Sequence, residues 1–351
     1  MFKSAIIGCG GIGPHHAASY RDTREVRLGA VVDCVPEKAE KLGRAHGVPW
    51  FADLKDVLKR DDIDIIDVCL PSGLHGDAAI AAARAGLHCI CEKPLDVTPQ
   101  RCDQIIRAFR KSGTVLGGIY QHRFAEDVRR AKKAIDAGGL GRLTLATCST
   151  PWWRTQEYYD SGDWRGTWRL DGGGVLMNQS IHAVDLLLWF CGPIRTVCAR
   201  TALLAHERVE IEDVAVATVE FESGALGVIQ GTTAAFPGGG VRHELMGTAG
   251  MIYLVDDHAT LWKLKDEAGA AKNGPAAPAT KPGVGAAADP TALTRELFAR
   301  NIDDVARAAR LGKAPLVTGE EHRRAVEVIC AIYKSARTGK PVRLPLKRFD
   351  P

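Results

Sequence analysis

The feature that most constrains this chain is the stretch from Ser4 to Ala18, with the sequence SAIIGCGGIGPHHAA. Its apolar start predicts a buried parallel strand, which runs through a GxGxxG turn into a helix. In such a turn Gly8 permits the tight bend, Gly10 lets the backbone approach a pyrophosphate, and Gly13 lets the helix lie close to the strand. The free N–H groups at the start of the helix attract an anion. The stretch therefore predicts a dinucleotide-binding βαβ unit.

A carboxylate follows at the spacing that this unit requires. The apolar segment 28–32 predicts a second strand, and it ends in Asp33, twenty residues after the last motif glycine. A carboxylate in that place binds ribose hydroxyls, which favours a bound ligand over an empty glycine-rich turn. The next residues are Cys34 and Val35 rather than a basic residue, so a 2′-phosphate would meet an unpaired carboxylate. We therefore expect NAD rather than NADP, although Lys38 leaves some use of NADP open.

The first 120 residues alternate strand and helix patterns. Strands are expected at 63–70, 87–91 and 114–120, and helices at 75–85 and 99–111. This alternation predicts a doubly wound parallel sheet, which binds ligands beyond the carboxyl ends of its strands. The residues expected to contact the cofactor there are Gly8, Gly10, Gly11, Ile12, Gly13, Asp33, Pro71, Ser72, His75, Glu92, Lys93 and Gln121.

The alternation of strand and helix patterns ends after Arg123. The pattern predicts a helix at 127–137, a strand at 143–150, an aromatic and polar loop at 151–171, and a helix at 175–190. Six further strands with only turns between them are expected at 196–204, 214–222, 225–233, 242–247, 251–255 and 260–264, with a hairpin turn at 222–224. Helices at 293–311 and 320–337 and an extended tail at 341–346 follow. We predict an α/β protein with a Rossmann domain over residues 1–122 and an α+β domain, built on a large, mostly antiparallel open sheet, over 123–351.

One face of that open sheet would carry the helices, and the other is expected to be broad and apolar. A second subunit is the simplest cover, so we expect a homodimer or homotetramer formed through this sheet. The Ala/Gly/Pro-rich segment 267–290 has no periodicity and predicts a surface loop without a function of its own.

The composition of the 351-residue chain argues against several classes of function. The formal net charge is +4, and the basic cluster at 129–133 fits a solvated helix face, so we expect no nucleic-acid partner. The apolar runs are too short to span a membrane, and the immediate first strand leaves no room for a signal peptide. The ten cysteines include no CxxC pair, which disfavours zinc and disulfides. We expect no metal and a reducing, cytoplasmic location.

A lysine ends a strand at the ligand-binding edge, in Glu92-Lys93-Pro94. Close to an oxidised nicotinamide and partly desolvated, its ammonium would be disfavoured and its pKa lowered. Lys93 would then be suited to exchange a proton with a hydroxyl. The alternative is an ordinary surface lysine, and position alone does not decide between the two.

The second chemical motif is GGGVLMNQSIHAVD, at residues 172–185. Its glycines predict a tight turn into a helix, and on that helix Asn178 and His182 would project from one face because they are four residues apart. Asp185 is placed to orient the His182 imidazole. A histidine beside an apolar run is more often structural, but the glycine turn and the asparagine favour a site. No third ligand at a suitable spacing accompanies the motif, so a metal is not expected.

Together these motifs resemble the Gfo/Idh/MocA oxidoreductases, which include glucose–fructose oxidoreductase and inositol dehydrogenases. The matching stretches are GCGGIG with Asp33, Glu92-Lys93-Pro94, Gln121-x-Arg123-Phe124, GGGVLMNQSIHAVDLLLWFCG and the ending SARTGKPVRLPL. The resemblance implies binding of NAD(P) and oxidation or reduction of sugars, cyclitols and related polyols. By position it implies that Lys93 is the catalytic lysine and His182 the catalytic histidine. Many members have Asp where this chain has Asn178, so Asn178 is left to orient the substrate by hydrogen bonds.

The loop at 151–171 is suited to bind a sugar, because Trp rings stack on the C–H groups of a sugar ring while Arg, Tyr and Asp form hydrogen bonds with its hydroxyls. The alternative is that the loop packs on a neighbouring subunit. Arg154 and Arg165 are also suited to bind a carboxylate or a phosphate. An acidic or nucleotide-linked sugar is therefore an alternative substrate. The substrate-binding candidates are Trp153, Arg154, Tyr158, Trp164, Arg165, Asn178 and His182, with Arg123, Gln179 and His243 behind them.

We therefore expect an NAD-dependent oxidoreductase that moves hydride between nicotinamide and a secondary hydroxyl or ketone of a sugar, glycoside or cyclitol. In this mechanism Lys93 and His182 handle the proton. One alternative is a glycoside hydrolase that retains NAD, oxidises a ring carbon transiently, eliminates the aglycone and shows no net NADH. Another is a non-catalytic NAD-sensing protein, which the retention of both residues and the lack of a DNA-binding motif disfavour.

Overall fold

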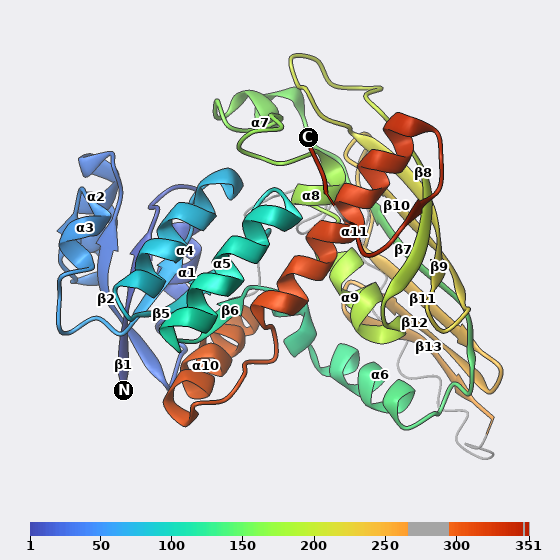
Figure 1. Cartoon of the computed structure of the whole chain (residues 1–351), viewed down its shortest axis with the longest axis horizontal. Helices are drawn as coiled ribbons and strands as arrows, with labels where there is room; N and C mark the ends of the chain where they lie inside the picture. The colour runs from blue at the N-terminus through green and yellow to red at the C-terminus, as the bar shows by residue number, and fades with distance from the viewer. Residues whose placement is uncertain (266–294, 347, 351) are drawn as a thin grey trace. The chain divides into compact units, whose positions relative to one another are not determined.

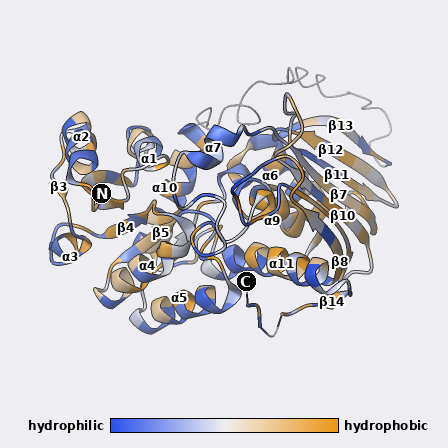
Figure 2. Ribbon diagram, turned by 90° about the horizontal axis from the view of Figure 1, so that it is seen from above, coloured by the Kyte–Doolittle hydropathy of each residue, from blue (hydrophilic) through white to orange (hydrophobic). Residues whose placement is uncertain are grey.

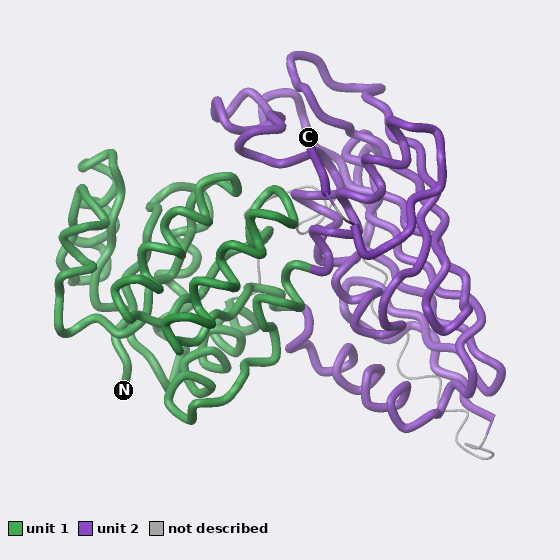
Figure 3. Tube along the Cα trace, in the orientation of Figure 1, with its two compact units in different colours: residues 1–121, 293–323 green, residues 122–292, 324–351 purple. Residues whose placement is uncertain are grey.

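The computed structural model describes residues 1–265, 295–346 and 348–350 (Figure 1). The predicted loop at 267–290 lies outside the described residues. The chain forms two compact units, coloured separately in Figure 3. Unit 1 takes Met1–Gln121 and Leu293–Arg323, and unit 2 takes His122–Ala292 and Arg324–Pro351. The predicted division into 1–122 and 123–351 thus differs from the structure, because a segment near the end of the chain belongs to unit 1.

Unit 1 contains a six-stranded parallel sheet in the order β3-β2-β1-β4-β5-β6. The predicted doubly wound parallel sheet is confirmed, and the strand order reverses beside β1, where such sheets bind ligands. The central strands are buried along most of their length because helices cover both faces. The strands are β1 (Phe2–Ile7), β2 (Val26–Val32), β3 (Trp50–Phe51), β4 (Ile65–Val68), β5 (His88–Cys91) and β6 (Leu116–Gly118).

The helices of unit 1 include one that comes from far along the chain. They are α1 (Gly13–Ser19), α2 (Pro36–His46), α3 (Leu54–Val57), the short 3₁₀ helix η1 (Ser72–Leu74), α4 (His75–Arg84), α5 (Pro99–Ser112) and α10 (Arg295–Leu311). Phe298 and Ile302 of α10 join the buried cluster around Ile6 and Ile90. The Asp303 carboxylate accepts hydrogen bonds from backbone N–H groups just before β2. These contacts explain why α10 belongs to unit 1.

Unit 2 contains an eight-stranded sheet in the order β13-β12-β11-β7-β10-β9-β8-β14. Every neighbouring pair is antiparallel except β10 and β7, so the predicted mostly antiparallel sheet is confirmed. The predicted hairpin turn at 222–224 joins β9 to β10, and the extended tail supplies β14. The strands are β7 (Leu143–Pro151), β8 (Ile194–Ala202), β9 (Val214–Phe221), β10 (Leu226–Thr232), β11 (Arg242–Gly247), β12 (Gly250–Val255), β13 (His258–Leu264) and β14 (Val342–Arg343).

Helices cover one face of this sheet. The hydrophobic α9 lies against it, as the orange ribbon in Figure 2 shows. The helical segments are η2 (Gln121–Phe124), which crosses the boundary between the units, α6 (Glu126–Asp136), α7 (Gln156–Asp160), α8 (Val175–Asn178), α9 (Ile181–Cys191) and α11 (Gly319–Thr338), which begins in unit 1. No helix among the described residues is both long and apolar enough to cross a membrane.

The predicted helix at 175–190 is two helices, and this corrects the sequence interpretation. The N–H groups of Gln179 and Ser180 both donate to the carbonyl of Val175, at 3.1 and 2.7 Å. Because two donors share one acceptor, the regular ladder is interrupted between α8 and α9. Asn178 and His182 therefore lie on different helices.

The other face of the eight-stranded sheet carries none of the described helices of unit 2. Side chains along each strand alternate between buried and exposed, as expected for a sheet covered on one side. Large apolar side chains stand on the uncovered face: Val216 is 48% exposed, Leu226 58% and Met251 38%. The expected broad face is present, with threonine and charged residues among its apolar ones.

Candidate functional site

The glycine turn after β1 leaves no room for side chains at two positions. Gly8 has φ of +103°, and a Cβ there would lie 2.5 Å from the carbonyl oxygen of Cys69. A Cβ at Gly13 would overlap the carbonyl oxygen of Gly8, so α1 packs directly on the strand end. Gly10 and Gly11, in contrast, face open space. The turn is therefore tightly packed on its protein side and open on the side where a pyrophosphate is expected.

The Asp33 carboxylate is held against this turn. Its Oδ2 accepts a hydrogen bond from the Cys9 N–H at 2.7 Å, and its Oδ1 accepts one from the Val35 N–H at 2.9 Å. No side chain caps the start of α1 at Ile12; Pro14 has no N–H, and the His15 N–H donates to the Ile12 carbonyl at 3.0 Å. Backbone donors, open space and a fixed carboxylate together fit a dinucleotide with free ribose hydroxyls.

Other cofactor candidates follow the ends of β4 and β6. Pro71 and Ser72 form the entry to η1, where Ser72 is buried. Gln121 is also buried, and its Oε1 has no hydrogen-bond partner among the described residues. A buried amide oxygen of this kind can accept a hydrogen bond from a ligand.

Glu92, Lys93 and Pro94 form a turn directly after β5. The Oε2 of Glu92 accepts the Lys93 N–H at 2.9 Å, and its Oε1 faces His16 Nε2 at 2.9 Å. Lys93 itself is partly buried. His75, expected to contact the cofactor, has both ring nitrogens against main-chain carbonyls, of Pro94 at 2.7 Å and Leu70 at 2.8 Å. The structure thus assigns the His75 ring to holding the backbone of this turn.

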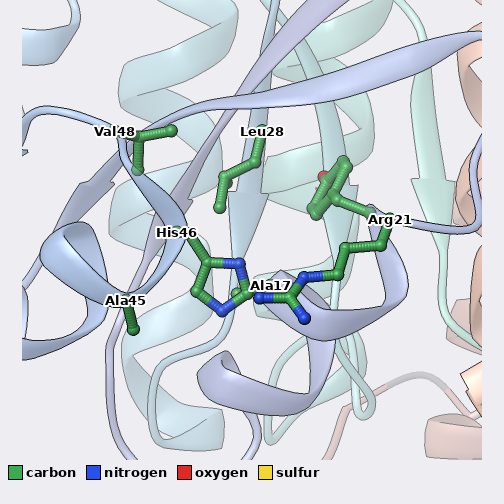
Figure 4. Close-up of a pocket in the computed structure, with 7 residues that line it drawn as sticks. Ala17, Arg21, Leu28, Ala45, His46 and Val48 are labelled. Atoms are coloured by element: carbon green, nitrogen blue, oxygen red, sulfur yellow. The ribbon is translucent and has the colours of Figure 1, made fainter.

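A small pocket of about 180 Å³ also lies in unit 1 (Figure 4). Ala17, Arg21, Leu28 and His46 line it, and burial together with the nearby Arg21 lowers the pKa of His46. Leu28 is near the start of β2, whereas Asp33 follows its end. The pocket is therefore separate from the predicted cofactor edge.

In unit 2 the glycine segment before α8 is fixed by a buried carboxyl group. A Cβ at Gly174 would overlap the carbonyl oxygen of Glu212, so only glycine fits. The Glu212 carboxyl group accepts hydrogen bonds from the N–H groups of Gly174 at 2.9 Å and Leu176 at 3.0 Å, and from the Tyr333 hydroxyl at 3.0 Å. Burial nevertheless raises the pKa of Glu212 to about 7. The Glu212 carboxyl group therefore fixes the start of α8, the helix that ends at Asn178.

The partners of the second motif differ from those expected. Asn178 donates from its amide to Asp171 Oδ1 at 2.6 Å. Asp185, expected to orient His182, binds the guanidinium of Arg123 through both oxygens, at 2.8 and 2.6 Å. Arg123, expected near the substrate, is buried and lies over the ring of Trp189. The Arg123–Asp185 pair is thus part of the interior of unit 2.

The residue beside His182 is one that sequence reasoning missed. The ring of His122 lies 5.0 Å from that of His182 in an edge-on arrangement, and its Nδ1 lies 2.5 Å from Asp257 Oδ2. Although burial opposes it, the Asp257 carboxylate raises the pKa of His122 above its ordinary value. His122 occupies the unspecified position of the Gln121-x-Arg123 motif, and Asp257 lies on the turn between β12 and β13. No sequence signal connected the two.

The loop at 151–171 gathers several of its candidates around one phenol. The Tyr158 hydroxyl accepts hydrogen bonds from Arg165 at 2.7 Å and from Gln179 at 3.2 Å. The guanidinium of Arg165 lies 4.3 Å from the centre of the Tyr158 ring, and that of Arg154 lies 5.4 Å from it. The guanidinium of Arg165 also lies 4.5 Å from the centre of the Trp164 ring. The guanidinium groups of Arg154 and Arg165 and the rings of Tyr158 and Trp164 thus form one group. Its Tyr158 hydroxyl contacts Gln179, which follows Asn178 in the chain.

Two other candidates lie elsewhere. Trp153 packs edge-on against Phe236, with ring centres 5.6 Å apart, and forms a backbone bridge with Ala234. His243 is buried on β11 and donates from Nε2 to the carbonyl of Ala183 at 3.0 Å. The His243 ring therefore connects the sheet to α9.

One group of side chains has the composition of a metal site: His16, Asp67 and Cys69. The His16 Nδ1 lies 2.8 Å from Asp67 Oδ2, and the Cys69 thiol donates to Asp67 Oδ1 at 3.7 Å. Because burial raises the pKa of Cys69 far above its ordinary value, the thiol stays protonated. Hydrogen bonding accounts for this cluster.

Comparison with known proteins places both halves of the chain. Residues 2–120 match the family model described as an oxidoreductase family with an NAD-binding Rossmann fold, and residues 128–253 match the GFO/IDH/MocA C-terminal domain. The scyllo-inositol 2-dehydrogenase (NAD(+)) of Bacillus subtilis is 27% identical, with 99% of this chain aligned to 97% of the relative. The D-glucoside 3-dehydrogenase of Escherichia coli is 28% identical over 64% of this chain and 68% of its own. The WlbA dehydrogenase from Bordetella pertussis, solved with NADH and UDP-GlcNAcA, has a TM-score of 0.85 and 31% identity, covering 99% of both chains.

The raised pKa of Glu212 predicts a pH dependence of stability. The native state favours the protonated carboxyl, so its stabilising effect is complete below the ordinary value of 4.5 and is lost as the pH rises through about 7. We expect Glu212→Gln to remove this dependence, making the variant more stable relative to the wild type at pH 8 than at pH 5 by about 1–3 kcal/mol. Denaturant unfolding at both pH values measures it. Glu222→Gln, in the exposed hairpin turn, is the matched control; a Glu212→Gln difference independent of pH would contradict the prediction.

Proposed function

The chain belongs to the Gfo/Idh/MocA family of NAD-binding oxidoreductases, which act on CH–OH groups of carbohydrates and polyols, and on this basis we propose the reaction that it catalyses. It transfers hydride between NAD and a secondary hydroxyl or ketone of a sugar, glycoside or cyclitol. Lys93 and His182 handle the hydroxyl proton. The observation that carries the proposal is the retention of the lysine turn after β5 and of the histidine on α9, in a chain whose relatives are sugar and inositol dehydrogenases.

The nicotinamide, when bound, accepts or returns the hydride. The residues of this chain provide the rest. Asp33 binds the ribose hydroxyls, and the open backbone at Gly10 approaches the pyrophosphate. Gln121 offers its unpartnered Oε1 as a hydrogen-bond acceptor.

A hydroxyl that loses hydride must also lose its proton, and two side chains are suited to receive it. Lys93 is partly buried, which disfavours the ammonium form, and a neutral amine is a proton acceptor. His182, whose ring contacts His122, is the second. Asn178 does not ionise, so it positions the substrate by hydrogen bonds while the two basic residues exchange the proton.

Unpartnered polar atoms in unit 2 support a substrate with many hydroxyls. Buried atoms with no hydrogen-bond partner among the described residues are Thr150 Oγ1, Trp152 Nε1, Gln179 Oε1 and Ser180 Oγ. Two of them are neighbours, because Thr150 is paired with Gly231 in the sheet and Ser180 Oγ lies against Gly231. Buried polar groups in native proteins normally have hydrogen-bond partners. The hydroxyl groups of a bound sugar or polyol would supply these partners.

An acidic or nucleotide-linked sugar is a second candidate substrate. Arg165 forms no ion pair within the described residues, and it is held by Tyr158 beside Arg154. The charge of Arg165 and burial both lower the pKa of Arg154, burial more strongly, and a bound anion would relieve the repulsion between the two cations. The WlbA dehydrogenase was solved with UDP-GlcNAcA, a ligand of this class.

An assembly through the eight-stranded sheet is part of the proposal. Residues that the strand register brings together on the uncovered face include Leu145, Thr147, Val216, Thr218, Leu226, Val228, Met246 and Met251. A second copy of the chain covers this mixture of apolar and hydroxyl side chains, forming a homodimer or, by repetition, a homotetramer. The cytoplasmic location expected from cysteine usage stays a prediction.

A substrate screen tests the reaction. Polyols, neutral aldoses, uronic acids and glycosides are supplied with NAD or NADP, and the NADH absorbance band is followed. A dehydrogenase produces net NADH from one of these classes, with NAD preferred. Release of aglycone from a glycoside without net NADH would instead support the hydrolase. A preference for uronic acids over neutral sugars selects the acidic candidate.

Removal of either proton-handling residue should abolish turnover without releasing the cofactor. We expect Lys93→Met and His182→Ala each to lower kcat by about 100-fold or more, because the hydroxyl then loses one of the two groups that exchange its proton. NAD binding, measured by fluorescence titration, should stay within about 3-fold. Lys111→Met, an exposed lysine on α5, is the matched control and should retain full activity. A Lys93→Met variant as active as the control would refute the assigned role.

A charge on the uncovered sheet face should dissociate the assembly. Val216 lies in the middle of β9, so Val216→Lys would bury an ammonium between two copies. We expect light scattering after size exclusion to show a smaller species than the wild type. Leu204→Lys is the matched control, since Leu204 is 72% exposed beyond the end of β8. A wild type that is itself monomeric would rule out the assembly.

A further inference from the structure

A buried histidine connects the helix after the glycine turn to the turn that carries Lys93. His16 is on α1 and is 0% exposed. Its Nδ1 lies 2.8 Å from Asp67 Oδ2 on β4, and its Nε2 lies 2.9 Å from Glu92 Oε1 after β5. Asp67 is also 0% exposed, and Glu92 is 5% exposed. One imidazole therefore bridges two buried carboxylates from two strands.

The geometry favours a charged imidazole. A neutral ring has one N–H, so it can donate to only one carboxylate, whereas the imidazolium donates to both. Although burial opposes it, Asp67 raises the pKa of His16 well above its ordinary value. The pKa of Glu92 is lowered despite burial, because His16 and, more weakly, Lys93 stabilise its carboxylate. The cluster then holds one cation and two anions.

The other groups that face His16 are neutral or turned toward Asp67. The Tyr20 hydroxyl donates to Asp67 Oδ2 at 2.9 Å, and burial raises its pKa well above the ordinary value. The Cys69 thiol, also neutral, donates to the other Asp67 oxygen. His15 precedes His16 on α1, and its pKa is lowered mainly by burial. From α10, the uncharged Phe298 ring lies 5.3 Å away.

Glu92 carries the effect of His16 to the lysine. One oxygen of its carboxylate is held by His16, and the other accepts the backbone N–H of Lys93 at 2.9 Å. On the far side of the turn, His75 holds the carbonyl of Pro94. The backbone of the lysine is thus fixed from both sides, by histidines on α1 and α4.

We propose that His16 is a positioning residue for Lys93: through Glu92 it fixes the lysine turn to the helix of the dinucleotide motif, and its positive charge offsets the buried carboxylates of Asp67 and Glu92. The importance of this arrangement for catalysis rests on the proposed role of Lys93. Without the imidazolium, the uncompensated anions would favour the lysine ammonium, the form that cannot accept a proton. Without the Glu92 charge, the neutral amine would be favoured instead.

The test reads the titration of the lysine directly and needs no substrate. The NAD-loaded protein is acetylated briefly with acetic anhydride over a range of pH, and mass spectrometry measures the modification of Lys93, with Lys111 as an internal reference. We expect His16→Gln to raise the midpoint of Lys93 acetylation by about 0.5–1 pH unit and Glu92→Gln to lower it by a similar amount. Midpoints equal to the wild type in both variants would overturn the proposal.

Tyr20→Phe separates a charge effect from a packing effect. It removes a hydrogen bond to Asp67 but leaves the contact between His16 and Glu92, so its midpoint should equal that of the wild type. A shift as large as that of His16→Gln would mean that any disturbance of the cluster suffices, and would overturn the proposal. If His16→Gln does not fold, Glu92→Gln still tests the sign.

A spectroscopic measurement on the unaltered protein is independent of these variants. In protein labelled with ¹⁵N-histidine, both ring nitrogens of His16, assigned by their absence in His16→Gln or by NOE contacts, should carry protons at pH 7. A neutral His16 ring at pH 7 would overturn the proposal. Failure of the proposed function looks different: Lys93→Met would keep activity, or no substrate would reduce NAD, while the titration and the ¹⁵N signals of His16 stay as expected.

Discussion

Two backbone contacts without room for a side chain determine the geometry of unit 1. One is the approach of Gly8 to the carbonyl of Cys69, and the other is the approach of Gly13 to the carbonyl of Gly8. They press α1 against the ends of β1 and β4, so whatever α1 carries takes a fixed position. His16 consequently reaches Asp67 and Glu92. The glycines that let α1 pack against the sheet thus also place His16 next to the lysine turn.

Most strands and helices could be predicted because their signals are local. A strand covered on both faces reads as an apolar run, and this located the central strands of unit 1 to within a few residues. The assignment of α10 could not be predicted. Its amphipathic pattern shows that one face is buried but not which partner covers it, and only the fold brings Phe298 and Ile302 to the core around Ile6. The break between α8 and α9 was missed because no glycine or proline marks it.

In the candidate site, too, local features could be predicted from the sequence, whereas contacts between distant residues could not. The position of Asp33 follows from its spacing to the glycine turn, and the structure shows its carboxylate bound to the Cys9 N–H. Pairs between distant residues could not be predicted: Arg123 with Asp185 spans 62 residues, and His122 with Asp257 spans 135. A motif specifies which residue types are present, whereas the fold decides which of them meet. Asp185 satisfied the spacing for His182, but a guanidinium offers a carboxylate two parallel hydrogen bonds and a permanent charge.

Asp33, Glu92 and Glu212 each fix a turn by accepting main-chain N–H groups, and they differ in burial and in the charges beside them. Asp33 is partly exposed beside the glycine turn. Glu212 is buried among neutral donors, and its pKa rises to about 7. Glu92 is also buried, yet its pKa is lowered, since His16 supplies a positive charge. Burial of an ion pair costs free energy that a neutral hydrogen bond avoids. Glu212 shows that a buried carboxyl group can fix a turn without a cation, so positioning alone does not explain His16. What the imidazolium adds is a carboxylate that stays ionised beside Lys93, and with it control of the charge around the amine that we propose exchanges the proton.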